Sequence, residues 1–181
     1  MEYVEPIRSI EQIQEMKKAL NYYGSKRDEF LFTLGINCGL RVSDMLKLKK
    51  KDIKDYKLRF RESKTRKLNT LPLFHIQKDI DNYIEFLEDD DYLFKSKRSN
   101  KPIQRVQAYR ILNRSAEAIG LKNIGTHSLR KTFGYHYYQR THDISLLMEL
   151  FNHSSQSVTL RYIGIHQDVI NETFSSNFKG L

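Results

Sequence analysis

The 181-residue chain is 39% apolar and 12% aromatic, which is enough for one sizeable hydrophobic core and too little to favour two. Its formal net charge of +9 at pH 7 favours a polyanionic partner, with a merely basic protein as the alternative. Cys38 is the only cysteine, so an intrachain disulfide is excluded and a reducing compartment fits. We find neither a signal peptide nor the roughly 20 consecutive apolar residues that cross a bilayer, and we therefore expect a cytoplasmic protein with no membrane partner.

Helical patterning fills the first 48 residues. A capping box at Ser9–Gln12 precedes apolar residues at helical spacing, and Gly39 marks the end of a second apolar face. We expect helices over about 9 to 22, from Ser25 to Gly39, and a short one from Arg41 through Leu48.

Short alternating segments at Tyr56–Phe60 and Lys67–Leu71 predict a small antiparallel sheet, with the cationic segment Ser63–Arg66 between its strands. Helical spacing resumes near His75 and continues to Leu87. Further helices are expected at 103–119, 127–140, 143–150, 155–162 and 167–176. The pattern predicts a mainly α fold with a small antiparallel β-sheet, forming a single domain over residues 1–181.

The residues best suited to chemistry lie between His127 and Tyr162. His127 and Arg130 are three apart, so on a helix they share a face and could contact one phosphate. An H-x-x-R pair is more often a solvated surface pair, and a single histidine such as His153 is more often structural. Tyr162 is one of 11 tyrosines, most of which we expect to serve packing.

Other chemistries have weaker support. The carboxylate run Glu88–Asp91 reads as a turn, because no histidine stands at ligand spacing to it. The chain has neither a G-x-x-x-x-G-K-[ST] loop nor a G-x-G-x-x-G motif. We therefore expect no metal site and no nucleotide cofactor.

Five short segments, in order, resemble the phage integrase or tyrosine recombinase family. They are Cys38-Gly-Leu-Arg41-Val-Ser-Asp44, Glu62-Ser-Lys64-Thr65, Thr126-His127-Ser-Leu-Arg130-Lys-Thr-Phe, Phe151-Asn-His153-Ser-Ser and Thr159-Leu-Arg-Tyr162. The resemblance runs from about residue 5 to residue 170. It implies the catalytic domain of a tyrosine recombinase, with the DNA breaking-rejoining enzyme fold.

The resemblance implies that Arg41 and Arg130 clamp the scissile phosphate, since planar guanidinium groups can donate paired hydrogen bonds to its oxygens. His127 would assist proton transfer from the nucleophile, and His153 would brace the pentacoordinate state. Tyr162 would be the nucleophile.

Lys64 would protonate the leaving 5′ oxygen, with Lys67 as the alternative. Asp44 matches an acidic position of the family that could orient His127 or Arg41. The family's more frequent Leu-Gly is replaced here by Phe151-Asn152.

The implied function is site-specific DNA recombination or integration, in which DNA is cleaved and rejoined through a 3′-phosphotyrosyl intermediate without metal or cofactor. The implied partners are double-stranded DNA, further copies of the chain in a tetramer on DNA, and accessory DNA-bending proteins. In isolation the chain could be a monomer.

The family's N-terminal core-DNA-binding domain is expected to be absent, which fits either a catalytic fragment or a naturally short recombinase. The tail after Tyr162 could dock on its own core or on a neighbouring protomer. The alternative functions are a non-cleaving DNA-binding regulator with the recombinase fold and a type IB topoisomerase-like relaxase.

Overall fold

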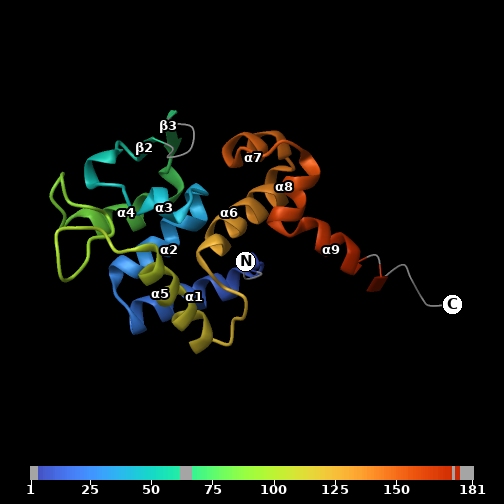
Figure 1. Cartoon of the computed structure of the whole chain (residues 1–181), viewed down its shortest axis with the longest axis horizontal. Helices are drawn as coiled ribbons and strands as arrows, with labels where there is room; N and C mark the ends of the chain where they lie inside the picture. Colours follow the sequence, from blue (N-terminus) through green and yellow to red (C-terminus); the bar gives the residue numbers. More distant parts are fainter. Residues whose placement is uncertain (1–3, 62–66, 173, 176–181) are drawn as a thin grey trace.

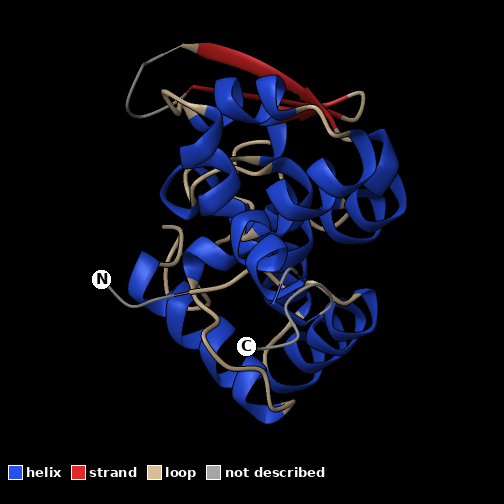
Figure 2. Ribbon diagram, turned by 90° about the vertical axis from the view of Figure 1, so that its right-hand side faces the viewer, coloured by secondary structure: helices blue, strands red, loops and turns tan. Residues whose placement is uncertain are grey.

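The computed structural model describes residues 4–61, 67–172 and 174–175, and within them helices make up most of the chain, with one small sheet at the edge (Figure 1). The sheet lies at one end of the molecule, with the helices beneath it (Figure 2). The helices are α1 Ile10–Tyr23, α2 Lys26–Cys38, α3 Val42–Met45, α4 Gln77–Ile84, α5 Arg105–Ala118, α6 Thr126–Thr141, α7 Ile144–Phe151, α8 Gln156–Ile163 and α9 Ile165–Glu172. This confirms the mainly α fold with a small antiparallel sheet.

The sheet has three antiparallel strands in the order β1-β2-β3, formed by Ile53–Lys54, Lys57–Arg61 and Leu68–Pro72. Along β2 the exposed side chains of Lys57, Arg59 and Arg61 alternate with the buried side chains of Leu58 and Phe60. This alternation identified β2 and β3 from the sequence. The two-residue strand β1 was not predicted, because it is too short to show a period.

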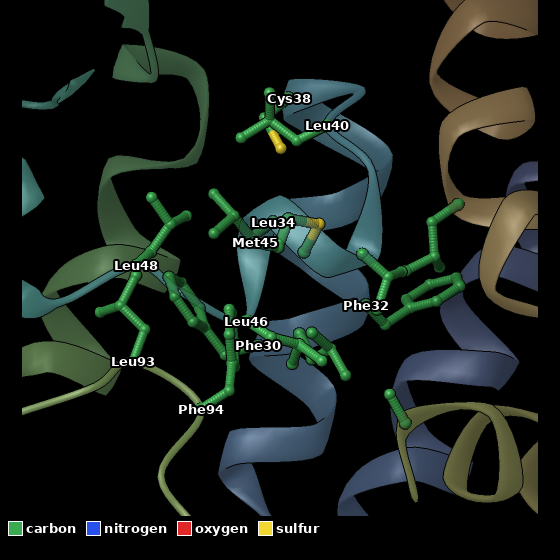
Figure 3. Packing of buried hydrophobic residues seen from close by; sticks show 14 of the residues in the cluster. Phe30, Phe32, Leu34, Cys38, Leu40, Met45, Leu46, Leu48, Leu93 and Phe94 are labelled. Carbon is green, nitrogen blue, oxygen red and sulfur yellow. The ribbon is translucent and has the colours of Figure 1, made fainter. Parts of the chain in front are cut away.

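A large hydrophobic core joins α1 to α5 and the sheet. Figure 3 shows its centre, where side chains of α2 such as Phe30 and Leu34 meet Met45 of α3 and the buried pair Leu93 and Phe94. Two of the expected caps are present, at Ser9 and Gly39, whereas Ser25 precedes α2 without a side-chain cap hydrogen bond. The Ser9 hydroxyl accepts a hydrogen bond from the amide of Gln12 at the start of α1, and Gly39 ends α2 with φ 64°.

A second, smaller hydrophobic cluster has Leu147, Phe151, Ile163 and Ile165 as its buried members. It joins α7, α8 and the start of α9 to one face of α6. Helix α6 also packs against α2 and α5 of the large core. It therefore lies between the two clusters, and its side chains can reach both.

The N-terminal segment crosses α6 and reaches α9. The amide of Ile7 donates to Thr132 Oγ1 over 2.9 Å, and Lys131 Nζ donates to the Val4 carbonyl over 2.8 Å. Arg8 forms an ion pair with Asp168 of α9 at 2.9 Å. Residues at the two ends of the chain thus fasten the last helix to the body of the domain.

Two expected boundaries were wrong by three residues. α3 ends at Met45 and α4 at Ile84, where we had expected Leu48 and Leu87. α9 begins at Ile165 instead of residue 167, because Gly164 at φ 88° ends α8 and a new helix starts directly after it. None of the helices described here is both long and apolar enough to span a membrane.

The close packing of α6 against the end of α2 can be tested at Gly39. A Cβ atom at Gly39 would lie 2.4 Å from the Phe133 ring, whereas one at Gly120, also at positive φ, would meet nothing within 4 Å. Gly120→Ala should cost about 1 to 2 kcal/mol through backbone strain. Gly39→Ala should cost that amount and about 1 to 3 kcal/mol more through overpacking. Urea unfolding measures both free energies, and equal losses would contradict the close contact.

Candidate active site

The guanidinium of Arg130 is buried at the centre of the candidate site, with 5% of the residue exposed. Its Nη1 donates to the Gly39 carbonyl over 2.7 Å, and its Nη2 donates to the Leu150 carbonyl over 3.1 Å. It also donates to the side chain of Tyr162. A guanidinium has five N–H groups in a fixed plane, so these bonds fix its orientation while leaving donors for an anion.

Tyr162 lies in the last turn of α8, half-buried in the second hydrophobic cluster. Burial raises the pKa of its phenol above the ordinary value, while the charges of Arg130 and Arg41 and the hydrogen bond from Arg130 oppose that rise. The phenol is thus neutral at rest, and the cations that would stabilise its anion are already in place.

His153 follows α7 directly. Asn152 ends that helix in the left-handed conformation, with φ 56° and ψ 50°, and the amide of His153 then bonds to the Met148 carbonyl. Asparagine tolerates this conformation almost as glycine does. Asn152 therefore supplies the left-handed helix end that glycine commonly supplies, and His153 follows it.

The tautomer of His153 follows from its hydrogen bonds. Its Nδ1 lies 3.1 Å from Thr159 Oγ1, and that hydroxyl donates to the Ser155 carbonyl over 3.2 Å. Because a hydroxyl has one hydrogen, we assign Nδ1 as the donor in its bond to Thr159, which leaves Nε2 as the nitrogen available to a substrate. Burial, followed by the charges of Arg130 and Arg41, lowers the pKa of His153.

His127 and Arg41 complete the part of the site that the structure describes. His127 lies in the first turn of α6, one turn before Arg130. Desolvation lowers its pKa, as do the charges of Arg105, Lys131, Arg130 and Arg41, in that order. Arg41 is half-buried and directly precedes α3. Its charge acts on His127, His153 and Tyr162 alike, which brings both arginines to the same site.

The roles of all the predicted site residues stay predictions, and for two of these residues the structure adds least. Lys64 lies outside the described residues, between β2 and β3. Asp44 is buried on α3 with 6% exposure, and its Oδ1 has no hydrogen-bond partner among the residues described. Its position three residues after Arg41 is compatible with an orienting role.

Three residues of the site were not identified from the sequence. Phe151 contacts Arg130, His153 and Tyr162, Thr159 bonds to His153, and Lys131 Nζ lies 5.3 Å from the centre of the Tyr162 ring. Lys131 and Thr159 stand inside the quoted segments, and Phe151 was noted only as a departure from the family pattern. The spacing of apolar and polar residues along the sequence does not distinguish these three residues from others on the same helices.

The arrangement is suited to an oxyanion that reacts with a phenol. The charges of two guanidinium groups act on the Tyr162 hydroxyl, and two imidazoles with lowered pKa values can each accept a proton at neutral pH.

Comparison with known proteins agrees with this chemistry. The model of the phage integrase family matches residues 9–168. The chain belongs to the phage integrase family.

YoeC of Bacillus subtilis (strain 168), a probable integrase/recombinase, is 53% identical over 171 residues, which are 93% of each chain. Other relatives are tyrosine recombinases, and the chain spans about half of their length, as with the 54% covered in XerA of Pyrococcus furiosus.

The catalytic domain fold of this family is confirmed by solved structures. The crystal structure of XerA recombinase matches with a TM-score of 0.75 at 19% identity, over 98% of this chain and 66% of that one. A lambda integrase dimer bound to a COC′ core site matches with a TM-score of 0.71 at 20% identity, over 89% of this chain and 48% of that one.

The bond between His153 and Thr159 can be tested by titration. Thr159→Val removes the acceptor of Nδ1–H at nearly constant volume and should lower the pKa of His153 further, because the imidazolium loses more from this bond than the neutral ring does. It should also cost about 1 kcal/mol of stability. NMR titration of His153, assigned with His153→Gln, measures the shift. Thr159→Ser keeps the hydroxyl and should keep the wild-type value, so an equal shift in both variants would contradict the assignment.

Proposed function

We propose that this chain is a site-specific DNA recombinase that cleaves and rejoins DNA through a 3′-phosphotyrosyl intermediate at Tyr162. The observation that carries the proposal is the contact of the Tyr162 hydroxyl with Arg130, within the field of Arg41. A phosphodiester placed between the two guanidinium groups would lie beside the nucleophile. Few other substrates would use two arginines, two imidazoles and a buried phenol together.

In the cleavage step, Tyr162 Oη attacks the phosphorus and its proton passes to a neutral base. His127 fits that task, since its lowered pKa keeps it unprotonated at neutral pH. Arg130 and Arg41 donate to the non-bridging oxygens as negative charge builds up on them. His153 supports the same oxygens through Nε2 once the phosphate has favoured its protonation.

The bond from phosphorus to the 5′ oxygen breaks as the phosphotyrosyl bond forms. We assign the proton for the leaving oxygen to Lys64, on the basis of the family pattern. In the second step a 5′ hydroxyl of the partner strand attacks the phosphotyrosine and releases the Tyr162 phenol. Because each step exchanges one phosphate ester for another, ligation needs no external energy source.

Double-stranded DNA is the proposed partner, and its binding would depend strongly on salt. The exposed cations of β2 form a row, Lys57, Arg59 and Arg61, on the outer face of the sheet, and the net charge is +9. The lambda integrase match is a DNA-bound dimer, which supports assembly of several copies on DNA. We propose a tetramer, assisted by DNA-bending proteins, that works in the cytoplasm where DNA is accessible.

The two alternatives predict different outcomes. The non-cleaving regulator has two grounds, the replacement of Leu-Gly by Phe151-Asn152 and the expected absence of the N-terminal domain. Asn152 adopts the left-handed backbone conformation that glycine favours, which weakens the first ground. A topoisomerase-like relaxase would act on supercoiled plasmid without site preference, whereas a recombinase requires its own site.

The decisive test is capture of the covalent adduct. Nicked duplexes built on candidate sites, chosen from the neighbouring genomic DNA as inverted repeats around a core of a few base pairs, should trap the wild-type chain, and Tyr162→Phe should reduce the adduct to background because it removes the attacking oxygen. The adduct is measured by its slow migration on a denaturing gel after single-turnover incubation.

Tyr138→Phe is the matched control, since Tyr138 packs against the same hydrophobic cluster and should retain wild-type adduct formation. Adduct that persists in Tyr162→Phe would refute the nucleophile. Salt-sensitive binding of these duplexes without any adduct from the wild-type chain would instead support a regulator.

A further inference from the structure

Phe151 lies where three residues of the proposed reaction meet. The Arg130 guanidinium carbon is 4.3 Å from the centre of its ring, and the rings of His153 and Tyr162 each lie 5.5 Å away at about 70°. His153 and Tyr162 also meet at 5.1 Å and 74°. The three rings thus pack edge to face in every pair, an arrangement that aromatic quadrupoles favour.

The Phe151 ring is closely confined. The residue is 1% exposed, and Phe133 lies on a further side at 6.3 Å. Helix α6 can approach only because residue 134 is glycine, since a Cβ there would lie 2.9 Å from the Phe151 ring and 2.5 Å from Ile163. A ring held this tightly can fix the orientation of the groups that touch it.

The contact with Arg130 has an electrostatic part that an aliphatic side chain cannot supply. Carbonyl oxygens hold two edges of the guanidinium, and the electron-rich face of Phe151 lies against its plane. A cation–π contact of this kind is stronger when it is desolvated, as it is here. Leucine, more frequent in the family at this position, would fill space without offering a ring face.

We propose that Phe151 is a positioning residue that orients Arg130, His153 and Tyr162 for phosphoryl transfer, acting on Arg130 through its ring face and on the other two through edge-to-face ring contacts. The proposal rests on the proposed function. Phe151 would hold the reacting groups in their relative orientations before DNA binds. Phe151 itself touches neither the phosphate nor the leaving group in this scheme.

The test replaces Phe151 by phenylalanines with one, three and five ring fluorines, introduced through a suppressor tRNA. Fluorination removes electron density from the ring face with little change of shape. Single-turnover adduct formation at saturating nicked duplex should fall stepwise, by about tenfold at five fluorines. The DNA dissociation constant should stay within about twofold of the wild-type value, because most of the binding free energy comes from phosphate contacts elsewhere on the protein. Rates that ignore the number of fluorines would overturn the electrostatic contact.

A second measurement uses the free protein and does not need cleavage. The Nε–H proton of Arg130, assigned with Arg130→Lys, should resonate upfield because of the Phe151 ring current, and Phe151→Leu should abolish that displacement while keeping a folded core. His153 and Tyr162 ring signals should shift in the same variant. Unchanged signals would overturn the positioning role. Should the signals shift while the wild-type chain forms no adduct, the placement of Arg130 would stand and the proposed function would fail.

Discussion

The structure depends on the burial of one positive charge. A guanidinium removed from water is costly unless its hydrogen bonds are replaced. Arg130 finds its replacements on three separate segments: the end of α2 at Gly39, the end of α7 at Leu150, and α8 at Tyr162. The hydrogen bonds of this one side chain therefore link the large core to the second hydrophobic cluster. The interaction that stabilises the charge is also the one that assembles the site.

The same environment sets the resting protonation of the site. Burial raises the pKa of Tyr162 and lowers the pKa values of His127 and His153, so the phenol and both imidazoles are neutral while the arginines carry the charge. In the proposed reaction an entering phosphate would reverse part of this balance, since its negative charge favours the imidazolium form of His153. The candidate site thus combines charged arginines that suit an anion with a neutral imidazole that would take the proton of Tyr162.

Local signals in the sequence predicted most of the fold. The cap at Ser9, the stop at Gly39 and the alternation along β2 depend on neighbouring residues, so they can be recognised without coordinates. The role of Phe151 could not, because its contacts are set by how α6, α7 and α8 pack, and an apolar residue at the end of a helix reads as core. The spacing of His127 and Arg130 suggested a shared phosphate, but the bond from Arg130 to Gly39 spans 91 positions and follows no pattern.

The ion pair between Arg8 and Asp168 joins positions 160 apart, and this separation bears on when the site is completed. Contacts between distant positions close slowly, because the loop entropy is lost before the contact forms. A chain emerging from the ribosome presents Arg41 and Arg130 well before Tyr162 and the helix that Arg8 fastens. Arg130 is therefore synthesised before two of its hydrogen-bond partners, Leu150 and Tyr162, so its burial and the arrangement of the candidate site are completed only after α8 has emerged.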